Sequence, residues 1–308
     1  MDSMAPVFVV GGVNMDTAGT PRKPLRTGDS NPGHVSMSPG GVGRNIAENL
    51  SRLGRKVYLV TVLGKDAYAD VIREHCANVG IDLSYSLTDP MGRTSTYLCL
   101  NEENGDLHAA VADMTIIDQM TPERLEPLIE TLNRGSMVIC DANLPEKTLG
   151  WMAEHVTIPM AADPVSTAKA VRLRPLLSRL TMVKPNLPEA ELLVGAVPGG
   201  DAALPRLADR MHRAGVEKVF ISLGGRGVWA DDRHGGELLH CSPGRIVNTS
   251  GCGDAFIAAA ADAYLRGLNT VECARRGLAA AAICAEDPKA VSTGMSQEAI
   301  NLRVVSGL

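Results

Sequence analysis

The chain has 308 residues, of which 45% are hydrophobic, and a formal net charge of -5. The apolar content excludes an intrinsically disordered chain, and the dispersed Lys and Arg residues give no basic surface of the kind that binds DNA or RNA. Only ten residues are Phe, Trp or Tyr, too few for the stacking platforms that hold single-stranded nucleic acid.

The cysteines and the N-terminal residues indicate the cellular compartment in which the protein is expected. The seven cysteines are an odd number, and none are spaced as in a CxxC motif, so reduced thiols are expected. The N-terminal residues 1–6 include an acid and do not resemble a signal peptide. The most apolar helix, over residues 255–265, contains Asp262 and is too short to span a bilayer. We expect a soluble cytoplasmic protein without a membrane partner.

Strand and helix patterns alternate along most of the chain. Residues 7–13 form a continuous apolar run, typical of a strand buried on both faces of a sheet. A helix is expected over residues 42–53, where apolar side chains recur at helical spacing before Gly54. Further strands are expected at residues 57–63, 137–140, 159–162, 181–183 and 219–223, and further helices at residues 66–78, 122–133 and 204–214. The alternation predicts an α/β fold with a doubly wound, mostly parallel sheet, and no linker or repeat divides residues 1–308 into separate domains.

Two regions, residues 17–37 and 94–111, lack helical periodicity. Residues 93–100 and 107–111 have strand patterns on either side of an Asn104-Gly105 pair, a strong hairpin signal. We interpret both regions as one small β-sheet lid, formed by about residues 14–38 and 93–113, beside the main sheet. The alternative is two ordinary surface hairpins.

A first glycine-rich segment runs from Ser38 to Asn45 and opens a helix. Its glycines, Gly40 and Gly41 among them, allow a ligand to approach the backbone, and the helix start offers free N–H groups. Asn45, one turn into the helix, could bind a polar substrate. The segment lacks the Gly-Lys-Ser/Thr ending of a Walker A loop, and by itself it could be a tight turn.

A second such segment runs from Asn248 to Asp254 and precedes a long Ala-rich helix. The residues from Gly251 to Gly253 would direct successive backbone N–H groups at an anion, such as a phosphoryl group in transfer. Asp254 is either a general base beside this anion hole or an acid that complements the helix dipole.

Two weaker patterns lie between these segments. Asn186 and Glu189 stand three apart at a helix start, where they could hold a hydrated Mg²⁺ through its waters or form an ordinary capping box. Ser222 is followed by Gly224, Gly225 and Gly227, which could form a turn or leave room for the phosphates of a nucleotide. Asn14 and Asp16 follow the first expected strand, at the carboxyl edge where open α/β sheets bind ligands.

The order of these motifs along the chain resembles the ribokinase family of sugar and nucleoside kinases, also called the phosphofructokinase B family. The resemblance covers essentially the whole chain, and in that family the small sheet is a lid over the sugar. Within the family, the stretch Asp29-Ser30-Asn31-Pro32-Gly33 and the residues around Thr96 and Asp113 resemble the members that phosphorylate pseudouridine.

The resemblance implies an ATP- and Mg²⁺-dependent transfer to a ribose 5′-hydroxyl, with Asp254 as catalytic base and the amides of Gly251, Cys252 and Gly253 as the anion hole. The implied substrate-binding residues are Asn14, Asp16, Ser30, Asn31, Gly40, Gly41, Asn45, Thr96 and Asp113. The implied nucleotide-binding residues are Asn186, Ser222, Gly224, Gly225, Gly227 and Thr249, and Glu189 and Asn186 would organise Mg²⁺.

Ser30 and Asn31 would read the edge of the uracil base, although the same residues could form an Asx or Ser turn before Pro32. Cys252 stands where Ala is usual, and Asn248 stands where an Asp often helps to bind a monovalent cation, which leaves a potassium requirement open. The adenine pocket is expected to include residues 286–294, and many relatives form homodimers through their lids. Rival hypotheses are a kinase for another nucleoside or a free sugar, and a catalytically silent nucleoside-binding member.

Overall fold

The computed structural model describes residues 5–104, 106–196, 199–240 and 244–306. Its main sheet has the strand order β15-β14-β13-β12-β11-β10-β1-β4-β6. The strands are β1 (Val7–Val10), β4 (Val57–Val60), β6 (Ile81–Asp82), β10 (Met137–Asp141), β11 (Met160–Asp163), β12 (Met182–Val183), β13 (Lys218–Ser222), β14 (Val228–Asp231) and β15 (Gly236–Leu239). The strands from β6 to β13 are parallel, and β14 and β15 add an antiparallel edge. The predicted mostly parallel sheet is confirmed.

Helices cover both faces of this sheet, because side chains of the buried strands alternate between two cores. Val7 and Val9 of β1 belong to one core, and Phe8 and Val10 to the other. The first core is completed by α1 (Val42–Arg52), α2 (Ala67–Asn78), α9 (Cys252–Leu265) and α10 (Thr270–Ala285). The second is completed by α3 (Pro122–Leu125), α5 (Glu146–His155), α6 (Thr167–Ala170), α7 (Leu187–Leu193) and α8 (Leu204–Ala214), and α11 (Gln297–Val305) packs on α10.

Two expected elements are broken in the structure. The helix expected over residues 122–133 is interrupted by the 3₁₀ turn Glu126–Leu128, because Pro127 has no N–H to continue the ladder. α4 (Ile129–Leu132) follows this turn. The strand expected over residues 57–63 divides into β4 and β5 (Val62–Leu63), and β5 pairs with β7 (Leu87–Thr88) in a separate two-stranded sheet.

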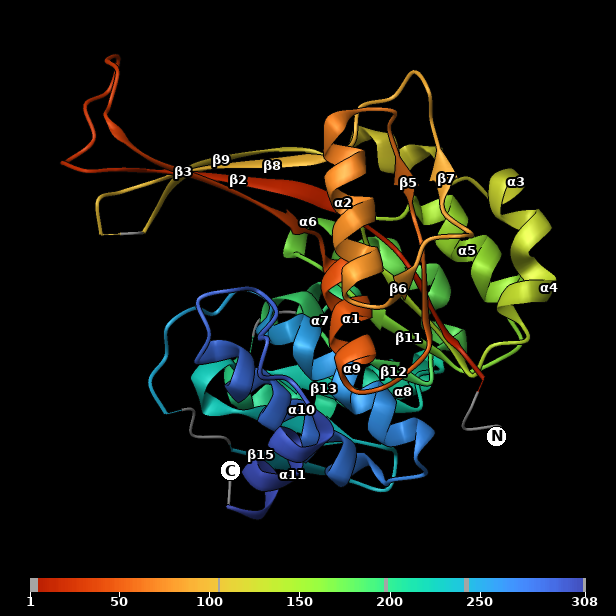
Figure 1. Cartoon of the computed structure of the whole chain (residues 1–308). Helices are drawn as coiled ribbons and strands as arrows, with labels where there is room; N and C mark the ends of the chain where they lie inside the picture. Colours follow the sequence, from red (N-terminus) through yellow and green to blue (C-terminus); the bar gives the residue numbers. More distant parts are fainter. Residues whose placement is uncertain (1–4, 105, 197–198, 241–243, 307–308) are drawn as a thin grey trace.

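A four-stranded sheet extends away from the main body (Figure 1). It consists of β3 (Gly33–Gly40), β2 (Asn14–Pro21), β8 (Thr96–Asn101) and β9 (Leu107–Asp113), in that order. β2 and β8 pair in parallel, so both irregular regions share one sheet, and the alternative of two separate hairpins is wrong. Asn14 and Asp16 belong to β2 rather than to the end of the first strand, which stops at Val10. Gly105 of the expected turn lies outside the described residues.

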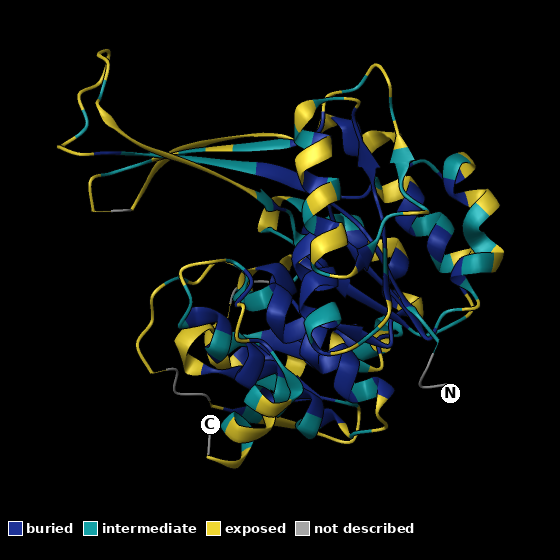
Figure 2. Ribbon diagram, in the orientation of Figure 1, coloured by how far each residue is buried: buried dark blue, intermediate teal, exposed yellow. Residues whose placement is uncertain are grey.

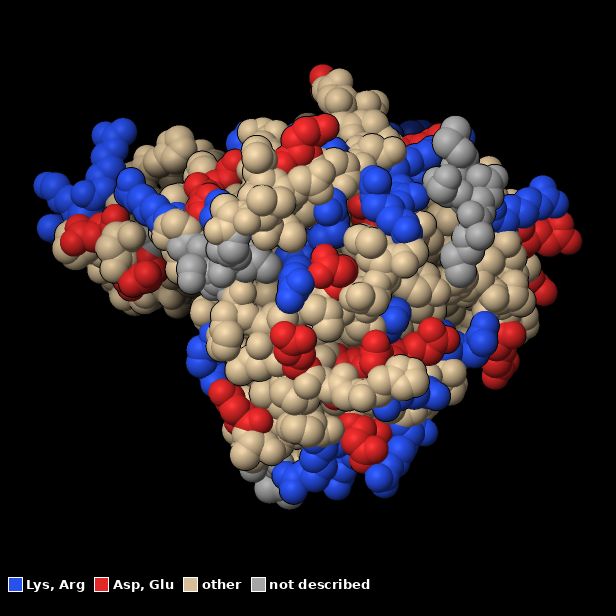
Figure 3. Space-filling model, turned by 90° about the horizontal axis from the view of Figure 1, so that it is seen from below, with Lys and Arg blue, Asp and Glu red and all other residues tan. Residues whose placement is uncertain are grey.

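The two sheets differ in how far their residues are buried. The strands of the main body are buried, whereas most of the four-stranded sheet is exposed (Figure 2). Acidic and basic side chains are interspersed over the face that Figure 3 displays. Within the described ranges, no helix has both the length and the apolar character needed to cross a membrane.

Candidate active site

The order in which successive parallel strands are added to the sheet reverses between β1 and β10. The loops that follow these two strands meet at this point. The Gly12 N–H donates a hydrogen bond to Asp141 Oδ2 over 2.8 Å, and a Cβ at Gly11 would lie 2.4 Å from the same oxygen. Glycine is therefore needed where the two loops touch. This switch point is where open α/β sheets form ligand sites, and the other candidate residues approach it.

Asp254 lies in the first turn of α9, buried between elements that are far apart in sequence. Asn45 Nδ2, from the first turn of α1, donates a hydrogen bond to Asp254 Oδ2 over 2.7 Å. Burial and the nearby charge of Asp163 raise the pKa of Asp254 to about 8, although the Asn45 hydrogen bond and Lys184 oppose the shift. In its deprotonated form, a carboxylate with this pKa is basic enough to accept a hydroxyl proton, as a general base must.

The start of α9 presents backbone donors beside this carboxyl. Gly251 caps the helix with φ of 80°, and a Cβ there would lie 1.9 Å from the Ala290 carbonyl oxygen, so only glycine fits. Among the described residues, the amides of Gly251 and Gly253 have no protein acceptor, and the Cys252 amide has only a long contact of 3.4 Å with the Thr249 carbonyl. The predicted anion hole therefore has donors to offer.

Lys184 is a site residue that the sequence reasoning missed. It follows β12, is 7% exposed, and places Nζ 3.2 Å from Asp163 Oδ2. A Cβ at Gly253 would lie only 2.6 Å from Nζ, so the cation touches the start of α9. Burial alone would lower the pKa of Lys184, but the carboxylates of Asp163, Glu189 and Asp254 raise it instead. The one available signal was its place immediately before the Pro185-Asn186 pair.

Asn186 and Glu189 form a complete capping box at the start of α7. Asn186 Oδ1 accepts from the Glu189 N–H, and Glu189 Oε2 accepts from the Asn186 N–H, each over 2.9 Å. Burial raises the pKa of Glu189. The capping alternative is thus present in the structure, and among the described residues Glu189 Oε1 has no hydrogen-bond partner. In the described ranges, no group of three or more His, Cys, Asp or Glu side chains is arranged to hold a metal directly.

A cavity of about 240 Å³ lies at the start of α9 and brings several predicted nucleotide residues together. Its polar lining consists of Lys184, Ser222, Gly224, Gly225, Gly227, Thr249, Cys252 and Gly253, and its apolar lining includes Ile246, Phe256, Leu278, Ala281, Ala282 and Ala285. Ser222 bridges to Asn186, which links the cavity to the capping box. The apolar wall comes from α9, α10 and residue 246, and none of residues 286–294, which the sequence analysis expected in the adenine pocket, lines this cavity.

The predicted sugar-binding residues gather where β2 and β3 leave the main body. Asn14 Nδ2 donates to Asp16 Oδ1 over 2.5 Å, and a Cβ at Gly40 would collide with the Asp16 carboxylate. Burial raises the pKa of Asp16, opposed by the Asn14 hydrogen bond and the charge of Arg44. Gly41, with φ of 98°, starts α1 against the Val13 backbone, and no other residue fits there.

Strand register divides the remaining lid residues between two faces. Asp16 is paired with Tyr97 on one side and Ser38 on the other, so these three side chains share a face. Thr96 is paired with Met15 and Asp113, and lies on the opposite face. The structure therefore does not bring Thr96 and Asp113 to the Asp16 face, and it offers Tyr97 and Ser38, which the sequence analysis did not single out.

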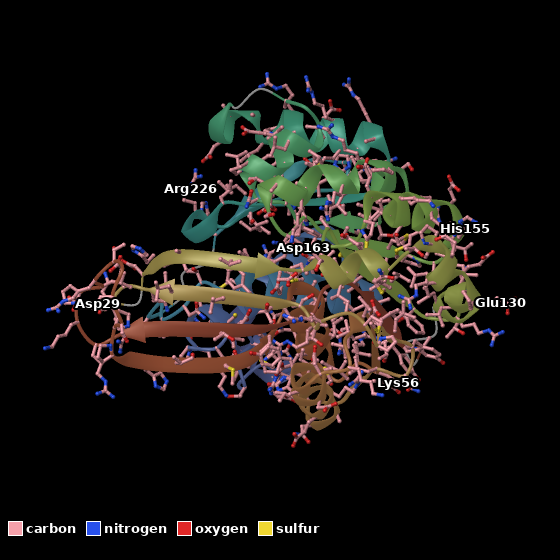
Figure 4. The ribbon with its side chains drawn as sticks, turned by 90° about the horizontal axis from the view of Figure 1, so that it is seen from above. Asp29, Lys56, Glu130, His155, Asp163 and Arg226 are labelled. Carbon is pink, nitrogen blue, oxygen red and sulfur yellow. The ribbon has the colours of Figure 1, made fainter. Side chains whose placement is uncertain are left out.

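Ser30 and Asn31 lie in the loop beyond the far end of β2. From Asp16 to Pro21 the strand alone spans about 17 Å, and Figure 4 shows Asp29 at the far end of the sheet from Asp163. The Asn31 side chain accepts from the Arg26 N–H and donates to the Arg26 and Asp29 carbonyl oxygens. The Asn31 side chain therefore stabilises the turn of this loop. In this structure Ser30 and Asn31 lie far from Asp16.

Comparisons with known proteins show the family and the fold of the chain. The model of the pfkB family of carbohydrate kinases matches residues 4–297. A pseudouridine kinase of Escherichia coli (strain K12) is 34% identical over 272 residues, which cover 87% of each protein. A carbohydrate kinase from Agrobacterium tumefaciens has 29% identity and a TM-score of 0.88, over 99% of this chain and 98% of that one. An Arabidopsis thaliana ribokinase in complex with ribose and ATP shares the fold, with a TM-score of 0.85 at 22% identity over 97% of this chain and 98% of that one. Because the family model matches residues 4–297 and a curated relative is 34% identical over 87% of the chain, the chain belongs to the pfkB family of carbohydrate kinases.

Proposed function

We propose that this kinase transfers the γ-phosphoryl group of ATP to the ribose 5′-hydroxyl of pseudouridine, giving pseudouridine 5′-phosphate. The observation that carries the phosphotransfer is the contact between Asp254 and Asn45 beside the free amides of Gly251 and Gly253. The choice of pseudouridine is supported by the 34% identity to the E. coli pseudouridine kinase.

In this mechanism Asp254 accepts the hydroxyl proton as the hydroxyl oxygen attacks the γ-phosphorus, and the bond to the β-phosphate oxygen breaks to release ADP. The amides of Gly251, Cys252 and Gly253 donate to the phosphoryl oxygens, and the Lys184 ammonium offsets their growing charge. Fixed donors at a buried site stabilise such a transition state more than mobile water does. Asn45 orients the carboxyl from the sugar side of the site.

The proposed nucleotide position is the cavity lined by Ser222, Gly224, Gly225, Gly227 and Thr249. A purine would lie against the apolar wall formed by α10, and the phosphates would reach the start of α9 past Gly253. The ribose of the acceptor would lie between Asp16 and Asn45, with Asn14, Gly40 and Gly41 shaping that side. Tyr97 and Ser38 face the same space from the lid.

A magnesium ion fits this donor set through its waters. Three buried carboxyl groups, Asp163, Glu189 and Asp254, surround the single ammonium of Lys184, so the site favours an added cation. Glu189 Oε1 is the free oxygen, while the Asn186 oxygen caps α7. Mg²⁺ would neutralise phosphate charge.

The position at which relatives often carry an Asp for a monovalent cation is occupied here by Asn248. Its Oδ1 accepts a hydrogen bond from the Ser250 N–H, and its Nδ2 donates one to the Pro288 carbonyl.

The small sheet would act as a lid and as a dimer interface. Its face opposite Asp16 exposes large apolar side chains from β3, β8 and β9, with Val35 66%, Met37 62%, Leu98 53% and Val111 67% exposed. A second copy of the same apolar face would cover this surface, as an isologous dimer requires. We expect Met37→Glu with Val111→Glu to yield monomers by light scattering, whereas Ser36→Glu, on the other face, leaves the dimer intact. A wild-type monomer would refute this interface.

ADP release with pseudouridine, uridine, adenosine, ribose and fructose 6-phosphate tests the substrate. We expect the highest kcat/KM with pseudouridine. Preference for another nucleoside or for a free sugar would reassign the substrate and leave the kinase chemistry in place. Absence of turnover with every acceptor, together with nucleoside binding by calorimetry, would support a catalytically silent binding protein instead.

A further inference from the structure

Cys252 and Cys284 lie side by side at the start of α9. Cys252 is the first residue of that helix, and Cys284 is in the last turn of α10. Cys252 packs against the small core that contains Cys284, and each of the two thiols shifts the pKa of the other. Both sulfurs also contact the loop before α9, because Cys252 Sγ lies 3.9 Å from the Asn248 carbonyl oxygen and Cys284 Sγ lies 3.5 Å from that of Ser250. The two thiols therefore occupy one small space.

Cys252 has the environment of a reactive thiol. The hydrogen bond from Cys284 and the charge of Lys184 lower its pKa, against the opposing effect of burial. It is half-buried and lines the cavity beside Gly253, so a small oxidant can reach the sulfur. Burial instead raises the pKa of Cys76 to about 11 and that of Cys273 to about 12. Thiolate character with access is what makes a cysteine oxidisable.

Cys284 has the complementary properties of a resolving thiol. Its pKa is raised, first by the hydrogen bond that it donates to Cys252 and then by burial, so it keeps its proton. It is fully buried and packs in the small core between α9 and α10. Once Cys252 is oxidised, its charge no longer raises the Cys284 pKa. Transfer of the Cys284 proton to the leaving hydroxide then gives the thiolate that attacks the oxidised sulfur.

We propose that Cys252 and Cys284 form a reversible oxidation site in which a peroxide closes a disulfide across the phosphate-binding edge of the enzyme. The Cys252 thiolate attacks one peroxide oxygen and the O–O bond breaks. The leaving hydroxide takes up the proton that Cys252 released on ionising, so that sulfenic acid and one water form. The Cys284 sulfur then displaces hydroxide from the Cys252 sulfur, its own proton converts the hydroxide to a second water, and the S–S bond forms. Two thiols are oxidised and one peroxide is reduced to two waters.

The disulfide would displace the anion hole. Its formation draws Cys252 toward α10 and removes the one thiol proton through which Cys284 contacts the Ser250 and Ala290 carbonyl oxygens. Gly251 cannot move toward Ala290, because a Cβ on Gly251 would already lie 1.9 Å from the Ala290 carbonyl oxygen. The adjoining amides must therefore shift, and a misplacement of about 1 Å can lower the rate about 10²-fold. This effect on the rate rests on the proposed kinase function, whereas disulfide formation does not.

Hydrogen peroxide on the full chain tests the site with two independent measurements. Non-reducing peptide mapping should show a Cys252–Cys284 link in wild type and in Cys99→Ala, a control that removes a lid thiol. Cys284→Ala should keep the basal rate and form no link. ADP with Mg²⁺ should slow the link by covering Cys252. ADP release should fall at least about tenfold on oxidation of wild type and recover with dithiothreitol.

The outcomes separate the two proposals. An active wild-type enzyme in which peroxide leaves Cys252 free, or converts it only to sulfinic acid, would overturn the oxidation site and leave the kinase function intact. A Cys252–Cys284 link in a protein that phosphorylates none of the acceptors when reduced would overturn the function and retain the site. A link without loss of rate would overturn the displacement of the anion hole.

Discussion

The carboxyl edge of the main sheet and the four-stranded lid sheet differ in what holds their side chains in place. Every residue of β10 is buried, whereas every residue of β9 is exposed. Asp254, Asn45, Lys184 and Asp163 contact one another inside the body. The lid is held mainly by strand pairing. Core packing thus holds the side chains around Asp254 in place, whereas no comparable packing holds the exposed lid sheet, on which the proposed choice of substrate depends.

Asp254→Asn should cause the largest loss of rate, and it tests the buried residues at the carboxyl edge of the main sheet. The amide keeps the shape and the contact with Asn45 but cannot accept the hydroxyl proton, so kcat should fall about 10²–10⁴-fold. Steady-state ADP release, with nucleoside binding by calorimetry as the control for folding, measures it. A variant that keeps about a tenth of the wild-type kcat would reduce Asp254 to a helix-start acid.

The pH profile checks the same carboxyl without a mutation. The base must be deprotonated, and burial raises the pKa of Asp254 to about 8 in the ligand-free protein. In wild type, kcat/KM should therefore rise with pH through this region and fall toward acidic pH, since protonation removes the base. Asp254→Asn should lose this limb. A wild-type profile that stays flat between about pH 6 and about pH 9 would contradict the assignment.

Lys184→Met should damage both rate and stability. Removing one partner of a buried ion pair costs about 3–5 kcal/mol, because Asp163 is left without its counter-charge. Loss of a donor to the phosphoryl group should lower kcat by roughly 10²-fold in the folded fraction. Urea denaturation measures the first effect and ADP release the second.

The double variant Lys184→Met with Asp163→Asn separates these two roles. Stability should recover in part, because no buried carboxylate is left unpaired, while the rate should stay low. Recovery of the rate along with stability would show that Lys184 only supports the fold.

Glu189→Gln should have a smaller and more selective effect. The glutamine amide oxygen can still accept from the Asn186 N–H, so the capping box and the stability should survive. Loss of the charge should raise the Mg²⁺ concentration for half-maximal rate about tenfold, as for other groups that act through metal-bound water. Glu191→Gln, two residues on, is the matched control. An unchanged Mg²⁺ dependence would leave Glu189 with its capping role alone.

Asn31→Ala tests the lid and should have the smallest effect. A contact between this loop and the base requires the lid to bend toward the main sheet or to come from a second copy. Loss of one hydrogen bond to pseudouridine should lower its kcat/KM about fivefold more than that of uridine. Thr27→Ala, in the same exposed loop, is the control. An equal loss on both nucleosides would move base recognition to the Asp16 face, where Tyr97→Leu can test it.

The sequence by itself determined the elements and the local backbone chemistry. Apolar runs and helical spacing placed the buried strands and α1, α2, α8 and α9, because local periodicity matches burial on a sheet. The positive φ of Gly41 and Gly251 follows from residue type, and so does the capping box at α7. These features depend on neighbours within a few residues, which a sequence states directly.

Only the tertiary structure decided which of these groups meet. Asn45 and Asp254 are 209 residues apart, and their contact depends on packing α1 against α9. Strand register, rather than composition, placed Tyr97 on the Asp16 face and Thr96 on the other, because a shift of one residue reverses the face. Lys184 is part of the site because the fold buries three carboxyl groups around its ammonium. Cys252 lies beside Cys284 because the end of α10 packs against the start of α9. Long-range contacts of this kind are set by the packing of whole elements, which no short motif encodes.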